Sequence, residues 1–249
     1  MKVVRKTAEG TAEATRFDPS VLLREAVRRY EELRPLYSAF CVHVRRLVTA
    51  EIAERSIKIH SIEARTKSVE GFERKIRRLL GVHRDCRNAP DLLKMVTDMA
   101  GVRLITFFPN TVLDLDAVIR ERFRVIERDD KTEFREAPSS FGYRSIHYLV
   151  ELAPGQLEPQ DVRWYQGLVA EIQVRTILQH AWAEIEHDIQ YKSVRAIPPA
   201  IRRRLAAVAG LLEIADREFQ AIRDEYDRHR KLPPAGKPGQ GPPEGGRIG

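Results

Sequence analysis

Residues 171–176 (EIQVRT) run directly into residues 177–192 (ILQHAWAEIEHDIQYK), and this stretch decides the fold. Because alternate side chains along an extended chain share a face, polar residues at every second position form one surface of a strand. Glu171, Gln173 and Arg175 are such residues. The aliphatic residues between them are expected to point into a core. The pattern therefore predicts a strand with one apolar face and one chemical face, leading straight into a helix.

The helix after this strand is expected to carry polar groups on one side. We expect Thr176 to cap its N-terminus, since threonine is a favoured N-cap residue. Steps of four, three and four residues keep one set of side chains on a common side, namely His180, Glu184, His187 and Tyr191. An adjacent apolar seam is expected from Ile177, Ala181 and Ile185. The alternative interpretation is a surface strand followed by an ordinary amphipathic helix.

Length and composition bound the class of protein. The 249 residues suit one large domain, and 43 Lys and Arg against 36 Asp and Glu leave a net charge of +7. Such a charge favours polyanionic partners, among them nucleotides, RNA and acidic surfaces. With Cys41 and Cys86 as the only cysteines, neither a disulfide framework nor a structural zinc site is supported. Since there is no secretory signal pattern and no apolar run of membrane-spanning length, we expect a cytoplasmic protein with no membrane partner.

The order of helical and strand patterns predicts an α+β fold. We expect a flexible N-terminus over 1–17, an N-terminal helical region over 18–56, a mixed domain over 57–197, a C-terminal helix over 198–230 and a disordered Pro/Gly-rich tail over 231–249. Pro35 is expected to break or kink the first helical region. Strand patterns occupy 57–64, 102–108, 123–126, 143–152 and 168–175, and a helix is expected over 91–99. We therefore predict a mixed β-sheet of about five strands flanked by helices, with helical extensions at both ends.

A basic cluster follows the first predicted strand. Its members are Arg65, Lys67, Arg74, Lys75, Arg77 and Arg78, with Ser68 among them. Arginine side chains bind phosphate oxygens in pairs and lysine adds a compact positive charge, so the cluster suits a polyphosphate. The alternative is a solvated basic face of a helix, which is the usual reason for such a run.

Asp98 precedes a predicted buried strand, and it can meet Glu171 if the two strands are neighbours in one sheet. Magnesium uses few protein oxygens and leaves its other positions to water and substrate phosphates. A sparse pair of carboxylates is therefore the expected signature of a phosphoryl-transfer site. The alternative is that Asp98 only ends its own helix.

Residues 139–147 (SSFGYRSIH) join a polar turn to a predicted strand. Tyr143, Ser145 and His147 share a face of that strand by alternation, which places an aromatic ring where it can stack on a base. His147 is compatible with a phosphate contact or with an ordinary structural role. The chain has no Gly-x-x-x-x-Gly-Lys phosphate loop and no Gly-x-Ser-x-Gly elbow, so P-loop and α/β-hydrolase chemistry are excluded.

Four motifs occur together in the order and spacing of one enzyme family. They are Arg65-x-Lys67-Ser68, Asp98-x-x-Gly-x-Arg103, Gly142-Tyr-Arg-Ser-Ile-His147 and Glu171-Ile-Gln-Val-Arg-Thr176, followed by His187 and Tyr191-Lys192. On these motifs, residues 57–195 resemble the RelA/SpoT alarmone synthetases, and most of all their small single-domain members. The resemblance implies a nucleotidyltransferase-like synthetase fold. It also implies transfer of the β,γ-pyrophosphate of ATP to the ribose 3′-hydroxyl of GDP or GTP, which yields AMP and ppGpp or pppGpp.

The resemblance further assigns roles to residues of this chain. It implies that ATP is held by Arg65, Lys67, Ser68, Lys75 and Arg77. It implies Mg²⁺ as cofactor, with Asp98 and Glu171 as its ligands. Glu171 would also be the catalytic base, with Gln173 and Arg103 beside it in the catalytic set. The acceptor nucleotide is implied to contact Tyr143, Ser145, His147, Arg175, His187 and Lys192.

One departure from the family pattern concerns the acceptor. Many members carry a basic residue and then Pro-Ser or Pro-Asn before Gly-Tyr, where this chain has Ser139, Ser140 and Phe141. Some relatives of this size are toxins that place pyrophosphate on adenine nucleotides or on the 3′ end of tRNA. Adenine nucleotides and tRNA therefore stay alternative acceptors, and an antitoxin protein stays a candidate partner. A non-catalytic RNA-binding module is the third hypothesis. The apolar C-terminal helix leaves a homo-oligomer open as well.

Overall fold

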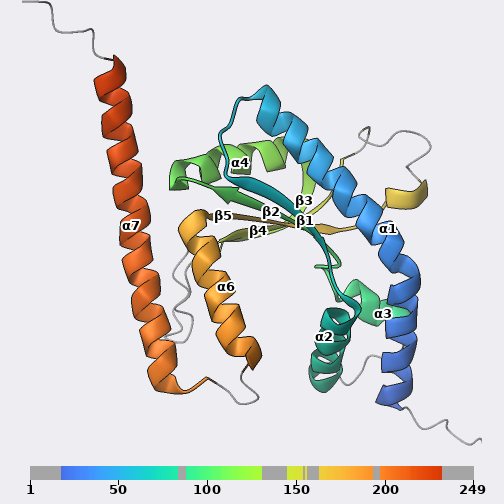
Figure 1. Cartoon of the computed structure of the whole chain (residues 1–249). Coiled ribbons are helices and arrows are strands. Elements are labelled where there is room, and N and C mark those ends of the chain that lie inside the picture. The colour runs from blue at the N-terminus through green and yellow to red at the C-terminus, as the bar shows by residue number, and fades with distance from the viewer. Residues whose placement is uncertain are drawn as a thin grey trace, which may run out of the picture.

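A five-stranded mixed sheet forms the centre of the protein in the computed structural model (Figure 1). The structure describes residues 18–83, 88–130, 145–153, 155, 163–192 and 197–231. The strands are β1 (Ser61–Thr66), β2 (Ala100–Thr106), β3 (Phe123–Asp130), β4 (Ile146–Leu152) and β5 (Ala170–Thr176). Their order across the sheet is β1-β2-β5-β4-β3, with β2 and β5 parallel and the other neighbouring pairs antiparallel. The predicted α+β class with a five-stranded mixed sheet is confirmed.

Helices flank this sheet. They are α1 (Pro19–Glu54), α2 (Val69–Val82), α3 (Ala89–Lys94), α4 (Pro109–Arg122), α6 (Ile177–Lys192) and α7 (Pro199–Lys231). α1 and α4 pack onto the strands and share one aliphatic core with them, which includes Val102, Leu104, Ile172 and Val174. α6 contacts β2 and β5, and α7 packs against α6 (Figure 1). The aliphatic residues of the 171–176 strand therefore point into the core, as the alternation predicts.

Two predicted helix starts are confirmed by their side-chain caps. At the start of α1, the Asp18 carboxylate accepts a hydrogen bond from the Ser20 amide at 2.8 Å. At the start of α6, the Gln179 amide donates to the Thr176 hydroxyl at 3.2 Å, and the Thr176 amide donates to the Gln179 side chain at 2.9 Å. This reciprocal capping box joins the end of β5 to the first turn of α6. The strand and the helix that form the site therefore keep a fixed relationship.

Of the predicted break or kink at Pro35, the break is wrong, because α1 continues through Pro35 to Glu54. A proline inside a helix costs about 3 kcal/mol. Tyr30 and Phe40, which flank the proline, are both 0% exposed, so their burial against the same core offsets that cost. The helix predicted over 91–99 is also too long, since α3 ends at Lys94 and the chain turns before it enters β2.

The apolar seam predicted on α6 is wrong at Ile185, which is 58% exposed. Among the residues of this helix up to Ile189, the buried one is Trp182, at 5% exposure. Trp182 packs with Leu178 against Leu205 and Ala209 of α7, and its indole N–H donates to the Leu205 carbonyl at 3.2 Å. The helix turns this side toward α7 because a large aromatic ring buries more apolar surface than an isoleucine does.

α7 is a single helix of 33 residues over the region where the sequence predicts one. The Thr176 hydroxyl donates to the buried Asp216 carboxylate at 2.6 Å, which fastens α7 to the end of β5. Within the described ranges, every helix is too short or too polar to cross a membrane. The predictions for 1–17 and for the tail lie outside the described residues, apart from Lys231, which ends α7.

Candidate active site

Polar side chains form two rows across one face of the sheet. The first row is Glu63 on β1, Arg103 on β2, Gln173 on β5 and His147 on β4. The second row is Arg65 on β1, Gly101 on β2 and Glu171 on β5. Since residues in a cross-strand row stand side by side, the pairing register brings together side chains from distant parts of the chain.

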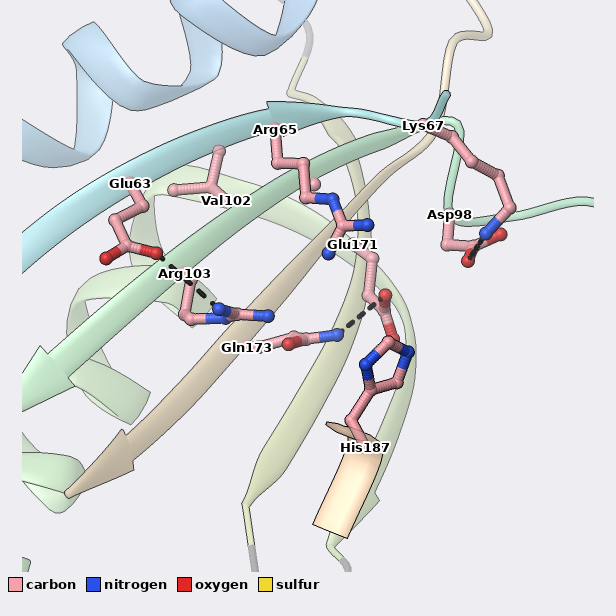
Figure 2. A pocket seen from close by; sticks show the side chains of 10 residues that line it. Glu63, Arg65, Lys67, Asp98, Val102, Arg103, Glu171, Gln173 and His187 are labelled. Atoms are coloured by element: carbon pink, nitrogen blue, oxygen red, sulfur yellow. Dashed lines mark hydrogen bonds and ion pairs between the residues drawn. The ribbon is translucent and has the colours of Figure 1, made fainter. Parts of the chain in front are cut away.

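Apart from His147, which contacts Glu171 from beside it, the residues of these rows line a cavity of about 230 Å³ (Figure 2). The sequence-predicted residues that line it are Arg65, Lys67, Asp98, Arg103, Glu171, Gln173 and His187. They come from β1, the β1–α2 turn, the segment before β2, β2 itself, β5 and α6. The cavity is smaller than the roughly 300–1,000 Å³ of sites that enclose a drug-sized ligand. Its size and its lysine and arginine lining suit a polyphosphate group.

Glu171 is held at both of its carboxylate oxygens. Oε1 lies 2.8 Å from His147 Nδ1, and Oε2 accepts a hydrogen bond from Gln173 Nε2 at 3.0 Å. Burial by itself raises the pKa of Glu171, but the interactions with His147 and Gln173 outweigh burial and leave the pKa below its usual range. The carboxylate is therefore ionised at neutral pH and has a fixed orientation in the cavity.

A hydrogen-bonded chain runs from Glu171 along β4 and β5. Ser145 Oγ lies 2.7 Å from His147 Nε2, on the far side of the ring from Glu171. At the other end, Arg175 Nη2 donates to Gln173 Oε1. Burial lowers the pKa of Arg175 to about 10, so this side chain still carries its charge at neutral pH. Ser145 and Arg175 thus hold His147 and Gln173, the two residues that contact the Glu171 carboxylate.

Asp98 is held by two lysines. Lys67 Nζ donates to Asp98 Oδ2 at 2.5 Å, and Lys75 Nζ donates to Asp98 Oδ1 at 2.7 Å. Burial by itself raises the pKa of Asp98, but the hydrogen bonds from the two ammonium groups outweigh burial and keep the pKa below its usual range. The β1–α2 turn and α2 are therefore tied to the segment before β2. Figure 2 shows Lys67 reaching over to Asp98 at the edge of the cavity.

Arg103 bridges two carboxylates that the motifs do not include. Its Nη1 lies 3.0 Å from Glu184 Oε1 on α6 and 3.5 Å from Glu63 Oε2 on β1. Glu184 stands on the side of α6 that the sequence predicts to be polar. Glu63 precedes Arg65 by two residues and shares its strand face, and that alternation is the signal that could have identified it.

Several predicted ligands lie beside the cavity rather than in it. The Ser68 hydroxyl accepts a hydrogen bond from the Gly71 amide at 3.1 Å, so it serves as the N-cap of α2. Arg77 pairs with an acidic residue one turn earlier on α2, and its side chain is 63% exposed. Tyr143 and the side chain of Lys192 lie outside the described residues.

Asp98 and Glu171 are carboxylates of this cavity that fit a divalent cation. The negative charge of Asp98 acts on Glu171, where it opposes the lowering of the pKa. Within the described residues, no group of three or more His, Cys, Asp and Glu side chains is arranged to hold a metal ion. Magnesium needs only one or two carboxylates when water and substrate phosphates complete its shell. The pair is therefore compatible with magnesium whose shell is completed by water and substrate phosphates.

Comparison with known sequences reveals similar proteins. The model of a region found in RelA and SpoT proteins matches residues 64–196. GTP pyrophosphokinase YwaC of Bacillus subtilis (strain 168) is 28% identical over 172 residues, which cover 68% of this chain and 76% of YwaC. GTP pyrophosphokinase YjbM of the same strain is 32% identical over 136 residues, which cover 53% of this chain and 60% of YjbM.

The fold also has similar solved structures. The crystal structure of the small alarmone synthetase 1 from Bacillus subtilis matches with a TM-score of 0.66 at 24% identity, over 80% of this chain and 98% of that chain. The likeness shows a shared fold. The family match spans the cavity-lining residues from Arg65 to His187, whereas Glu63, α1 and α7 lie outside it.

Proposed function

Since this chain belongs to the RelA/SpoT family, we propose that it is a GTP pyrophosphokinase that makes (p)ppGpp. It transfers the β,γ-pyrophosphate of ATP to the ribose 3′-hydroxyl of GDP or GTP and releases AMP. The two Bacillus subtilis relatives, both named GTP pyrophosphokinase, support this assignment. The fold shared with a small alarmone synthetase is consistent with it.

The observation that carries the proposal is the position of Glu171 in the cavity. It lies in the row of Arg65, with only Gly101 between them. A general base must stand within hydrogen-bond reach of the attacking hydroxyl, and cations must stand where negative charge grows. An ionised carboxylate beside guanidinium and ammonium groups on one sheet face meets both needs.

The chemical step follows from these positions. The 3′-oxygen of the acceptor attacks the β-phosphorus of ATP and forms a new P–O bond. The bond from that phosphorus to the oxygen shared with the α-phosphate breaks, and AMP leaves with this oxygen. Glu171 accepts the proton of the attacking hydroxyl. Because His147 and Gln173 already hold its two oxygens, the carboxylate enters the reaction without reorientation.

On the donor side, Arg65, Lys67 and Arg103 are the cations that would bind the polyphosphate of ATP. Their charges offset the negative charge on the group in transfer, which is the main catalytic need in phosphoryl-type transfers. Asp98 and Glu171 would hold Mg²⁺. When bound, this ion supplies charge neutralisation and polarisation of the transferred group.

On the acceptor side, His147, Gln173 and His187 are the residues proposed to meet the acceptor nucleotide. His187 faces the cavity from α6, across from the strands that carry the other two (Figure 2). Ser145 and Arg175 support this set through the hydrogen-bonded chain. Stacking of Tyr143 on the guanine and a phosphate contact from Lys192 are proposed from the family motif alone, as are the roles of Ser68, Lys75 and Arg77 toward ATP.

Transfer of label from γ-³²P-ATP in the presence of Mg²⁺ tests the proposal. We expect labelled product with GDP or GTP, and a much lower rate of labelling after Glu171→Gln, which removes the base with almost no change in size. Glu151→Gln is the matched control, because Glu151 lies on β4 and pairs with Arg124 outside the cavity. Label on tRNA but not on free nucleotide would instead identify a tRNA-modifying toxin. Label on neither acceptor would overturn the enzymatic proposal and favour an RNA-binding module.

A further inference from the structure

α1 reaches the ATP side of the cavity although it lies outside the region of the family match. Tyr30 of α1 is 0% exposed, and its hydroxyl donates to the carbonyl of Lys67 at 2.6 Å. Burial raises the pKa of Tyr30 to about 12, so the hydroxyl keeps its proton at neutral pH and stays a donor. A hydrogen bond from the N-terminal helix therefore ends at the residue that supplies a cavity cation.

Lys67 is part of neither β1 nor α2, the two elements that flank it. Lys67 lies between the end of β1 and Ser68, the N-cap of α2. Its amide donates to the Met99 carbonyl at 3.1 Å, which fixes one side of the residue. Its carbonyl oxygen accepts a hydrogen bond from the Tyr30 hydroxyl, and Arg34 Nε lies 3.4 Å from the same oxygen. Because both backbone groups of Lys67 are held, Tyr30 helps to set the point from which the lysine side chain extends.

The ring of Tyr30 supports the same turn from a second direction. It stacks on Phe72 of α2, with ring centroids 4.2 Å apart and planes inclined by 14°. The ring therefore positions α2, while the hydroxyl positions the residue just before it. The two effects are separable, because removal of the oxygen alone leaves the stacked ring in place.

We propose that Tyr30 is a positioning residue for the donor nucleotide, whose hydroxyl holds the β1–α2 turn so that the Lys67 ammonium meets the ATP polyphosphate. The inference rests on the proposed function. Lys67 already reaches the cavity, where its Nζ lies 2.5 Å from Asp98. Tyr30 itself does not line the cavity and acts through Lys67. Without its hydroxyl the turn relaxes, so ATP binding weakens while acceptor binding is unchanged.

A second residue of α1 also contacts the backbone of a cavity-lining segment. Cys41 Sγ lies 3.0 Å from the Gly101 carbonyl on β2, as a donor to it. Tyr30 and Cys41 thus hold carbonyls of two segments that line the cavity, Lys67 in the β1–α2 turn and Gly101 in the second row. α1 therefore packs on the sheet and also forms hydrogen bonds with two segments that line the donor side of the cavity.

Tyr30→Phe and Tyr37→Phe form a matched pair of variants. Each removes one phenolic oxygen from a buried ring of α1, and the two ring centroids are 6.4 Å apart. Within the part of the chain that the structure describes, the Tyr37 hydroxyl makes no hydrogen bond. Binding of the ATP analogue AMPCPP with Mg²⁺, measured by isothermal titration calorimetry, is expected to weaken roughly three- to tenfold in Tyr30→Phe, as for one lost hydrogen bond. It is expected to stay at the wild-type value in Tyr37→Phe.

Kinetics and a double variant separate positioning from a general loss of stability. In Tyr30→Phe the KM for ATP should rise by the factor by which AMPCPP binding weakens, while the KM for GDP stays unchanged. In a Lys67→Met background, Tyr30→Phe should cause no further loss of AMPCPP affinity, because the two residues act through one interaction. Thermal unfolding of each variant gives the folded fraction.

Three results would overturn the inference. They are wild-type AMPCPP affinity in Tyr30→Phe, equal losses in Tyr30→Phe and Tyr37→Phe, and additive losses in the double variant. If the wild-type chain binds AMPCPP but labels neither GDP nor GTP, the acceptor half of the proposed function fails and the binding data still decide the role of Tyr30. If the wild-type chain does not bind AMPCPP, both proposals fail.

Discussion

Arg65 and Glu171 stand in one cross-strand row of the sheet, with only Gly101 between them. Because Gly101 has no side chain, the row leaves a gap between a cation and the proposed base. Gly101 itself lines the cavity at this point. In the proposed reaction, the pyrophosphate that passes from donor to acceptor would occupy this gap.

Gly101→Ala is expected to lower kcat/KM for the transfer by roughly tenfold, because small displacements of reacting groups are costly. A Cβ atom at this position would lie 3.3 Å from the Arg65 carbonyl oxygen, so β1 must shift slightly. Gly81→Ala is the control, since a Cβ there would meet nothing within 4 Å and the residue lies in α2. It should preserve activity and stabilise the helix by up to about 1 kcal/mol. A wild-type value of kcat/KM in Gly101→Ala would contradict the placement of the transferred pyrophosphate between Arg65 and Glu171.

Glu184→Gln is expected to lower the KM for ATP by roughly two- to fivefold. Glu184 competes with the phosphates for Arg103, and its side chain is 53% exposed, so the ion pair contributes less than about 1 kcal/mol. Arg103→Ala should raise the KM for ATP instead. Initial rates with ATP varied at fixed GDP measure both effects. A higher KM in Glu184→Gln would show that Glu184 orients Arg103 for ATP rather than competing with it.

The loss of stability in acid is expected to depend on Asp98. Burial raises the pKa of Asp98, but hydrogen bonds from Lys67 and Lys75 reverse this and keep it below the ordinary value of 3.8. A carboxylate with a lowered folded-state pKa contributes stability that is present above its unfolded pKa and is lost as the pH falls through the folded value. Asp98→Asn should therefore flatten the decline in unfolding free energy below about pH 4, as measured by urea unfolding. An unchanged decline would mean that the lysine contacts do not persist in solution.

Asp216→Ala is expected to destabilise the protein by about 1–3 kcal/mol, because the Thr176 hydroxyl loses a buried partner. Thr176 is 0% exposed and Asp216 is 4% exposed, and their hydrogen bond joins α7 to the end of β5. Glu218→Ala, at an exposed position of the same helix, should change stability by less than about 0.5 kcal/mol. Urea unfolding compares the two variants. Equal free energies of unfolding would show that the hydrogen bond between Thr176 and Asp216 does not stabilise the attachment of α7 to the sheet.

Features that depend on local backbone geometry could be predicted from the sequence. The alternation of Glu171, Ile172 and Gln173 is enough to assign their faces, because the side-chain period of a strand is fixed. The cap at Thr176 is equally local, since its partner Gln179 lies one turn away.

Features that depend on tertiary contacts could not be predicted in this way. The continuation of α1 through Pro35 and the rotation of α6 toward Trp182 both follow from burial against distant elements. The contact between His147 and Glu171 requires β4 to lie beside β5, which strand order decides. Alternation places Glu63 on the strand face of Arg65, but its contact with Arg103 follows from the register of β1 with β2, which no local pattern gives.

The rate of label transfer by Glu171→Gln tests the central claim most directly. Measured with γ-³²P-ATP and saturating GDP, kcat is predicted to fall by roughly 100- to 10,000-fold, the usual contribution of a general base. The thermal unfolding midpoint should stay close to that of the wild type, because glutamine keeps the shape of the side chain. A folded Glu171→Gln protein with kcat near the wild-type value would contradict the assignment of Glu171 as the base.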